Sequence, residues 1–177
     1  MLSFRSICLR EIQIVPFTKK HITDRYVSWL NDPLTVQFSE QRHCRHTKQT
    51  CLAYYQRMKR SKHLFLAIEA LTPARRHVGN ISVEIDYPNQ RGDQGILIGD
   101  AHARGRGIGY QSWNAVLLWL LQSGQIRMVT AGAMRSNHPM VHIFEKCGMK
   151  IQAIREGYFM LNNKAEDLVL ACKQGGL

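Results

Sequence analysis

The stretch that most constrains this chain is Arg104-Gly105-Arg106-Gly107-Ile108-Gly109, in which every second residue is glycine. It lies between a short apolar run, Gly95 to Gly99, and a long segment with apolar residues at helical spacing. Glycines let backbone amides crowd together where a helix begins, and the free N–H groups there bind phosphate oxygens. The arginine side chains add positive charge at the same place. The sequence therefore predicts a strand, a phosphate-binding turn and a helix in succession.

Two well-known phosphate-binding loops do not match this turn. The chain has no Gly-x-x-x-x-Gly-Lys-Ser/Thr run, which excludes a P-loop, and the alternate glycines do not fit the Gly-x-Gly-x-x-Gly pattern of dinucleotide-binding proteins. A tight turn that only joins two elements remains the alternative.

A second motif runs from Asn137 to Met149 and reads Asn-His-Pro-Met-Val-His-Ile-Phe-Glu-Lys-Cys-Gly-Met. With Arg104-x-x-Gly107-x-Gly109 before it, this part of the chain resembles the GNAT superfamily of N-acetyltransferases. In that family an Arg/Gln-x-x-Gly-x-Gly/Ala loop binds the pyrophosphate of acetyl-CoA, and the second motif marks the helix beside the pantetheine arm. The segment Ile22 to Pro33 is similar to the opening helix of branches that acetylate ribosomal-protein N-termini or nucleotide-linked amino sugars. The resemblance covers the chain from about Leu9 to Cys172.

The order of strand-like and helix-like segments favours an α+β fold, because the two kinds alternate only in part. The resemblance implies a GNAT-like domain over residues 1–177, with a central, largely antiparallel mixed sheet of about six to seven strands and about four helices. Periodicity and turn residues predict helices over 48–60 and 107–122 and another that begins at Asn137 and ends at Gly148. They also predict a loop over 87–93 that leads into a strand over 94–99, and a final hairpin over 150–171.

Charge restricts the class of ligand. The chain has 24 Lys and Arg residues against 13 Asp and Glu, a formal net charge of +11. A positive field attracts anionic ligands and repels cationic ones, so CoA and a nucleotide-linked acceptor suit it better than a polyamine. A basic nucleic-acid-binding module is the competing explanation of this charge, although it leaves the segment from Asn137 to Met149 without a purpose. No apolar run approaches the ~20 residues of a membrane span, so we expect no membrane partner.

The five cysteines are scattered, odd in number and without Cys-x-x-Cys spacing. They fit reduced thiols and predict a cytoplasmic protein. One cluster, His43-Cys44-Arg45-His46 with Cys51, contains residue types that bind zinc. Because Arg45 and Lys48 bring positive charge into the same cluster, we expect an ordinary loop there and no metal.

The resemblance also assigns the groups that hold the acetyl donor. Amides of the glycine loop anchor the diphosphate, and the preceding strand end splays from its neighbour so that its free backbone groups pair with the pantetheine arm. Asn137 reaches that arm or caps its own helix, or does both. The cofactor-binding residues are then Leu97, Ile98, Gly99, Arg104, Gly105, Arg106, Gly107, Ile108, Gly109, Asn137 and Phe144.

Acetyl transfer to an amine needs a base, because an aliphatic amine with a pKa near ~10 is protonated at neutral pH. Glu84, on the polar face of a predicted strand, is the first candidate, and His102 is the second. A solvated strand carboxylate is the alternative explanation of Glu84. Many GNAT enzymes place a tyrosine hydroxyl near the thioester sulfur, at the position occupied here by Phe144, which cannot donate a proton. Cys147, His142 and Tyr158 are candidates for the acid by their chemistry alone.

Together these observations predict an acetyl-CoA-dependent N-acetyltransferase that works by direct attack of a primary amine in a ternary complex. The acceptor is a small molecule, such as a nucleotide-linked amino sugar, or a peptide, such as a protein N-terminus. A GNAT-like domain that binds CoA without catalysis stays open because of Phe144, and a homodimer stays open as well.

Overall fold

The computed structural model describes residues 2–175, and within this range the strands form one eight-stranded sheet in the order β1-β2-β3-β4-β5-β6-β8-β7. Neighbouring strands are antiparallel except for β5 and β6, which run parallel. The expected α+β architecture is confirmed, with slightly more strands than predicted. The strands are β1 (Ile7–Cys8), β2 (Ile12–Pro16), β3 (Leu64–Ala70), β4 (Arg76–Asp86), β5 (Arg91–Ile98), β6 (Met128–Met134), β7 (Lys150–Leu161) and β8 (Lys164–Gln174).

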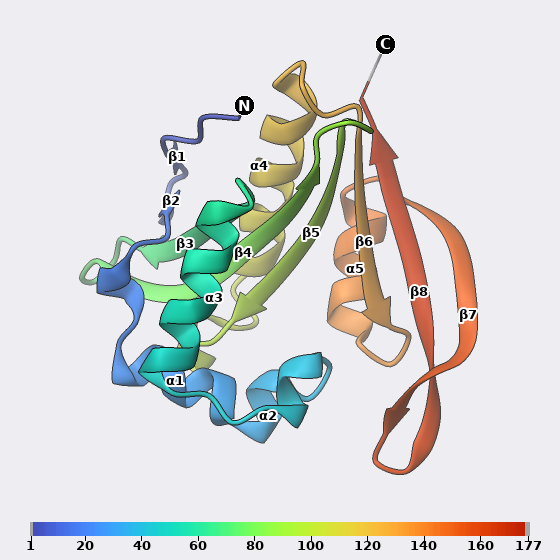
Figure 1. Cartoon of the computed structure of the whole chain (residues 1–177), viewed down its shortest axis with the longest axis horizontal. Coiled ribbons are helices and arrows are strands. Elements are labelled where there is room, and N and C mark those ends of the chain that lie inside the picture. Colours follow the sequence, from blue (N-terminus) through green and yellow to red (C-terminus); the bar gives the residue numbers. More distant parts are fainter. Residues whose placement is uncertain (1, 176–177) are drawn as a thin grey trace.

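Helices cover both faces of the sheet (Figure 1). One face carries α3, with α1 and α2 at one end of it, and the opposite face carries α4 and α5. The helices are α1 (Asp24–Asn31), α2 (Pro33–Val36), α3 (Lys48–Arg60), α4 (Ile108–Gln122) and α5 (His138–Lys146).

Capping residues explain where the helices on the α3 face begin. The Thr23 hydroxyl accepts a hydrogen bond from the Tyr26 amide at the start of α1, and Thr47 does the same for α3. Asp32 caps the additional short helix α2, in which Pro33 takes the first position, where a missing N–H costs nothing. The breaker residues therefore divide the N-terminal helix into two and bring α2 close to the end of β5.

The loop expected over 87–93 is shorter than the sequence predicts. The turn occupies only the residues between Asp86 and Arg91, and Arg91 to Asp93 belong to β5, where they pair with β4 on one side and β6 on the other. Gly92 is a packing residue rather than a turn residue, because a Cβ there would lie 3.0 Å from Val83 Cγ1. Strand pairing on both sides has overridden the local turn preference of these residues.

Two clusters of apolar side chains hold the layers together. The larger one joins the sheet to α4, where Trp113, Val116, Leu117 and Leu120 are at most 1% exposed. A smaller one joins the other face to α1 and α3, and its members are Phe17, Tyr26, Trp29, Leu30, Cys51 and Ala67. None of the helices formed by residues 2–175 combines the length and the apolar character that crossing a bilayer requires.

Candidate functional site

Strands β5 and β6 diverge partway along the sheet. They pair only at Arg91 to Asp93, after which β6 pairs with β8 alone and β5 with β4 alone (Figure 1). The Gly99 amide donates to the Val78 carbonyl, so the alternation of an antiparallel pair turns the backbone groups of Ile98 away from β4. Backbone groups of β5 are thus left without a strand partner in the described chain. An extended ligand can pair with such an edge.

The glycine loop follows directly after β5. A single 3₁₀ turn, η3 (Ala101–Ala103), leads into Gly105 and Gly107, which have φ values of 71° and 76°. Gly107 is the N-cap of α4 and offers no side-chain cap, and the first turn of the helix holds no acidic residue. The first amides of α4 therefore remain available to an anion, as the predicted phosphate-binding turn requires.

A buried carboxylate fixes the start of this loop. Asp100 is 3% exposed and accepts hydrogen bonds from Arg25, at 2.8 Å, and from Arg76, at 3.2 Å. Burial by itself would raise the pKa of Asp100, but the hydrogen bond from the His102 amide and the two arginines lower it overall. The ionised carboxylate ties the loop to α1 and β4.

The two arginines of the loop have different surroundings. Arg104 lies over the end of β5, with its Nε 3.1 Å from the Ile98 carbonyl oxygen and its Nη2 2.7 Å from the Thr35 hydroxyl. Arg106 is half exposed and lies 4.0 Å from a Glu11 carboxylate oxygen. Arg104 therefore closes one end of the open β5 edge and connects it to α2.

The glycine at position 99 is required by packing at the end of β5. A Cβ on Gly99 would lie 2.0 Å from Cδ2 of Trp29, so the absent side chain makes room for this indole of α1. Packing against Trp29 therefore explains the glycine at this position, and contact of Gly99 with a cofactor stays a prediction. The close contact holds α1 against the end of β5.

Asn137 and Phe144 belong to α5, on the far side of the divergence. The Asn137 side chain accepts from the Met140 amide at 3.3 Å, so it caps the helix, as one of the two interpretations expected. Phe144 is 0% exposed, and its ring centroid lies 5.7 Å from that of Trp113. In this structure Phe144 is a core residue with no exposed surface, and contact with a cofactor stays a prediction for both residues.

The three candidate acids lie apart from one another. Cys147 is buried, and burial raises the pKa of its thiol. The His142 side chain is exposed on α5, 3.9 Å from a Glu145 oxygen, and Tyr158 is 53% exposed on β7. None of the three lines either of the cavities described below.

A cavity of about 280 Å³ opens beside β5 where the strands diverge, on the face that carries α3. Its wall includes the β5 residues Gly95, Ile96 and Leu97, and no Asp, Glu, Lys or Arg lines it. Burial raises the pKa of the Tyr26 phenol, so the phenol stays neutral. The polar side chains in the wall are those of Tyr26, Ser39, Gln41, His46, Thr50, Tyr54, Asn80 and Ser82.

Glu84 and His102 are not brought together. Glu84 is exposed on β4, opposite Asp93 and two residues beyond Ser82, while His102 is exposed in η3 past the end of β5. Neither lines the cavity. The negative charge of Glu84 nevertheless acts on a residue of the cavity wall, Tyr54. Burial is the main cause of the raised pKa of Tyr54, and Glu84 contributes to the same shift.

Sequence reasoning missed most of the cavity wall. Tyr26, His46 and Tyr54 come from α1, from the segment before α3 and from α3 itself, and no motif links them. His46 also has a buried Nε2 without a hydrogen-bond partner in the described chain. Ser82 gave the one available signal, because it shares the polar face of β4 with Glu84.

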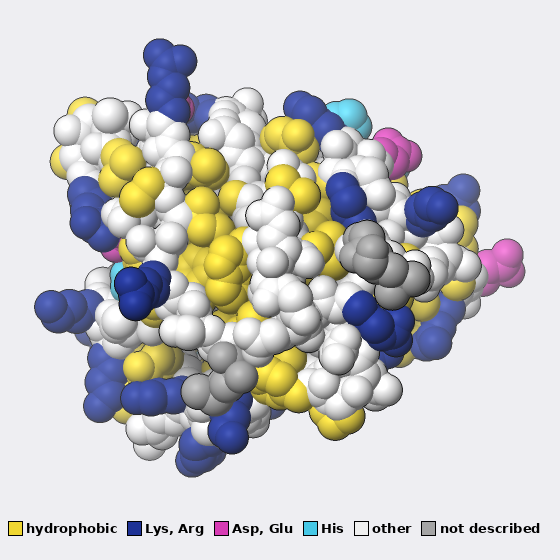
Figure 2. Space-filling model, turned by 90° about the horizontal axis from the view of Figure 1, so that it is seen from above, with side chains coloured by type: hydrophobic (Ala, Val, Ile, Leu, Met, Phe, Trp, Pro, Cys, Tyr) yellow, Lys and Arg dark blue, Asp and Glu magenta, His cyan; other side chains and the backbone are white. Residues whose placement is uncertain are grey.

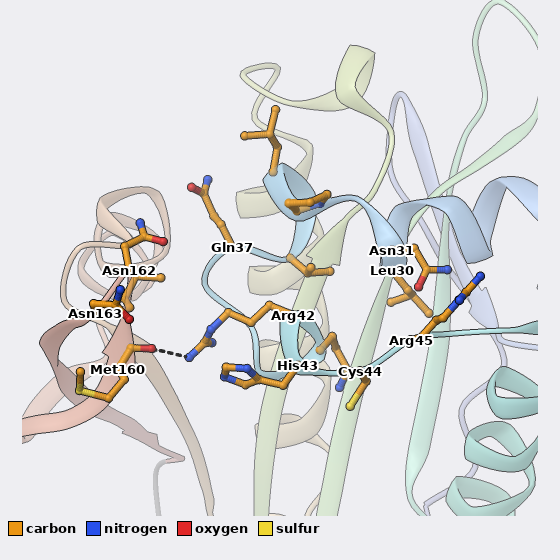
Figure 3. A pocket seen from close by; sticks show the side chains of 15 residues that line it. Leu30, Asn31, Gln37, Arg42, His43, Cys44, Arg45, Met160, Asn162 and Asn163 are labelled. Atoms are coloured by element: carbon orange, nitrogen blue, oxygen red, sulfur yellow. Dashed lines mark hydrogen bonds between the residues drawn. The ribbon is translucent and has the colours of Figure 1, made fainter.

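A second, larger cavity of about 940 Å³ lies between the α1–α2 region, the 3₁₀ turn η2 (Glu40–His43) and the turn that joins β7 to β8 (Figure 3). Arg42 spans it, donating from Nη2 to the Met160 carbonyl at 3.2 Å (Figure 3). The cluster that was weighed as a zinc site is divided between the cavities: His43, Cys44 and Arg45 line this wall, whereas His46 and Cys51 line the smaller cavity. Residues 2–175 contain no group of three or more His, Cys, Asp or Glu side chains arranged to hold a metal ion.

Comparison with known proteins identifies the family. Residues 11–150 match the model of the acetyltransferase (GNAT) domain, and the chain belongs to this family. It is thus an N-acetyltransferase by family, with acetyl-CoA as the acetyl donor, and the open β5 edge and uncapped α4 fit that donor. A search of curated protein sequences gave no match.

Solved structures share the fold at low sequence identity. The microcin C7 self-immunity acetyltransferase MccE, in complex with acetyl-CoA and AMP, is 18% identical over 93% of this chain and 92% of its own, with a TM-score of 0.78. Spermidine N-acetyltransferase from Vibrio cholerae, in complex with CoA and spermine, is 14% identical over 93% of this chain and 95% of its own, with a TM-score of 0.81. RimL, the ribosomal L7/L12 α-N-protein acetyltransferase in complex with CoA, is 14% identical over 97% of this chain and 98% of its own, also with a TM-score of 0.81.

Proposed function

We propose that this protein transfers the acetyl group of acetyl-CoA to a primary amine by direct attack in a ternary complex. The observation that carries the proposal is the open edge of β5 after Asp93, next to the uncapped first turn of α4. The edge supplies backbone partners for an extended arm, and the helix start supplies amides for a diphosphate.

Each part of the donor then has a counterpart in the chain. Amides from Arg104 to Gly109 hold the diphosphate, while the Ile98 amide, which faces away from β4, holds the pantetheine arm and orients the thioester. The backbone groups of Leu97 face β4, so we expect Leu97 to contribute only its place in the cavity wall. Asn137 borders that arm from α5, and the fully buried Phe144 supports this helix from the core. The amine approaches through the 280 Å³ cavity, which ends on the same stretch of β5. Positioning of this kind supplies several orders of magnitude in rate by itself.

The transfer needs one proton removed and one supplied. The amine nitrogen forms a bond to the thioester carbonyl carbon, the carbon–sulfur bond breaks, and the electron pair leaves with sulfur. Glu84 takes the amine proton through water or the hydroxyls of Ser82 and Tyr54, since Glu84 lies about 7 Å beyond Ser82 along β4. His102 is the second candidate for the base. With phenylalanine at position 144, the thiolate takes its proton from water or from another group.

For the acceptor, two amines from the same family remain: an amino sugar linked to a nucleotide, and a protein N-terminus. The complex of MccE with AMP supports the amino sugar linked to a nucleotide. The similarity to RimL, an α-N-protein acetyltransferase, supports the protein N-terminus. The formal net charge of +11 disfavours a polycation such as spermine.

Binding of nucleic acid is less well supported. On the face seen in Figure 2, Lys and Arg side chains are spread mostly around the rim and do not join into one stripe. A basic module also leaves the divergence of β5 and β6 without a use. A non-catalytic CoA-binding domain stays a competitor because Phe144 has no hydroxyl.

Two assays test the proposal together. Isothermal titration with CoA is expected to show one site per chain, and duplex DNA is expected to give no heat at the same salt concentration. Release of free thiol from acetyl-CoA is then followed over a panel of amines that contains amino sugar nucleotides, peptides with free N-termini and spermidine. CoA binding with no amine-dependent thiol release would favour the non-catalytic domain, and absence of CoA binding would refute the proposal.

A further inference from the structure

The 940 Å³ cavity beside the β7–β8 turn has a wall of unusual chemistry. Its charged side chains are Arg42 and Arg45, accompanied by His43, and no Asp or Glu lines it. In Figure 3, Arg42 and His43 both extend toward the β7–β8 turn, whereas Arg45 lies on the opposite side next to Asn31. Such a wall attracts an anion.

The two arginines have different tasks. Arg42 is held by the Glu40 carboxylate at 2.8 Å and by the Met160 and Ser39 carbonyls, so it braces η2 against β7. Arg45 is exposed and makes no hydrogen bond or ion pair with the part of the chain that the structure describes. Its guanidinium is therefore free to bind an anionic oxygen, and it presents the paired donors that suit phosphate.

Carboxamides complete the wall. The side chains of Gln37, Gln41, Asn162 and Asn163 line the cavity and make no hydrogen bonds within residues 2–175. Asn162 and Asn163 form the β7–β8 turn with φ values of 50° and 61°, which fixes the backbone that carries them. Carboxamides both donate and accept, so they match the hydroxyl groups of a sugar and the edge of a base.

The large cavity adjoins the small one. Leu30 and Gln41 line both, so a ligand that fills the large cavity can extend past them toward β5. The large cavity also has the size of an ordinary small-molecule site, for which volumes of about 300–1,000 Å³ are typical. The two cavities therefore suit the two ends of one acceptor.

We infer that the 940 Å³ cavity binds the phosphate-bearing, hydroxyl-rich part of a small-molecule acceptor, with Arg45 on the phosphate. The inference rests on the proposed function, because it takes the amine of that acceptor to lie in the smaller cavity. Four free carboxamides favour a nucleotide or sugar phosphate over an acidic peptide, whose side chains need cations at several points. A polyamine meets repulsion from both arginines.

The test uses the full chain saturated with CoA, so that the site for the acetyl donor is already filled. AMP, adenosine, spermidine and a blocked peptide of four aspartates are titrated separately by calorimetry. AMP is expected to bind with one site per chain, adenosine at least tenfold more weakly, and the peptide and spermidine without measurable heat. Arg45→Gln is expected to weaken AMP about tenfold by removing a charge-assisted hydrogen bond, with CoA affinity unchanged. Arg60→Gln, an exposed arginine on α3 away from both cavities, is the matched control and is expected to change neither affinity.

The failures of the two proposals are distinct. If CoA itself does not bind, the proposed function fails. If CoA binds but AMP gives no heat, or if AMP binds equally well to wild type and to Arg45→Gln, the anion site is wrong. Binding of the aspartate peptide without AMP would replace the nucleotide by a peptide acceptor and would also overturn the inference.

Discussion

Arg104 Nη2 donates a 2.7 Å hydrogen bond to the hydroxyl of Thr35, and this contact joins the glycine loop to α2. The Thr35 hydroxyl in turn donates to the Asp32 carboxylate, which caps α2. The same guanidinium donates to the carbonyl of Ile98 at the end of β5. One side chain therefore links the segment that we propose holds the acetyl donor to α2, which lines the 940 Å³ cavity.

This link predicts separable effects of two substitutions. Arg104→Ala removes positive charge next to the diphosphate and support for β5, so we expect CoA to bind about tenfold more weakly and the KM of the acceptor to rise. Thr35→Val removes the contact between Arg104 and α2 together with the hydrogen bond from Thr35 to Asp32, but it leaves Arg104 in place. It should therefore raise the acceptor KM while CoA affinity stays within twofold of wild type. Calorimetry with CoA and steady-state kinetics measure the two effects. Equal loss of CoA affinity in both variants would contradict the link.

Two glycines at opposite ends of α4 offer a matched pair. Gly107 and Gly124 both have positive φ, 76° and 68°, and neither is crowded by other atoms. Valine at either position costs about 1–2 kcal/mol of stability through backbone strain. Only Gly107→Val should reduce CoA affinity, by at least tenfold, because only that end of the helix is proposed to bind the diphosphate. A similar loss in Gly124→Val would show that strain alone is responsible.

The proposed base gives a signature in the pH profile. Glu84→Gln removes proton acceptance but keeps the size of the side chain, so we expect kcat at pH 7 to fall by about 100-fold, as is typical of general-base catalysis. The loss should shrink as the pH rises, because the amine then loses its proton without help. His102→Gln serves as the comparison. A pH-independent loss in Glu84→Gln, or a larger loss in His102→Gln, would remove Glu84 from the mechanism.

The buried side chain of His77 makes the stability of the fold depend on pH. Burial, with help from the neighbouring His21, lowers its pKa to about 4, and its Nε2 lies 2.9 Å from the Gly79 carbonyl oxygen. The unfolded chain, with a histidine pKa near ~6.5, takes up a proton first as the pH falls, so the stability is present above pH 6.5 and is lost toward pH 4. One proton that only the unfolded chain binds changes the free energy of unfolding by about 1.4 kcal/mol per pH unit. Urea unfolding should therefore show that this free energy falls by about 2 kcal/mol between pH 6.5 and 5.

The control for this prediction is His77→Gln, which removes the titrating group. Its free energy of unfolding should change far less between pH 6.5 and 5 than that of wild type. The same slope in both proteins would assign the pH dependence to other groups.

Much of the fold follows from local signals in the sequence. The helix predicted over 48–60 has those bounds, and the helix predicted over 107–122 begins one residue later, because capping and periodicity act within a few residues. The strand over 91–93 was missed because pairing with β6, far along the chain, outweighs the turn preference of Gly92. Local signals cannot report such pairing.

The candidate site shows the same difference between local signals and contacts made far along the chain. The glycine loop is contiguous, so its place at the start of α4 follows from the sequence, whereas the cavities join residues that are more than 100 positions apart, such as Arg42 and Met160. Gly99 shows a further limit, because the residue that leaves no room for a side chain there, Trp29, lies 70 residues away in the sequence. Polar faces of strands also do not reveal whether a carboxylate such as Glu84 borders a cavity or bulk solvent.

A crystal structure of the protein with CoA tests the central claim most directly. We expect density for the diphosphate against the backbone amides from 104 to 109, with the pantetheine arm alongside β5 from Gly95 to Ile98. Density for CoA at any other part of the surface, with the start of α4 still free, would contradict it.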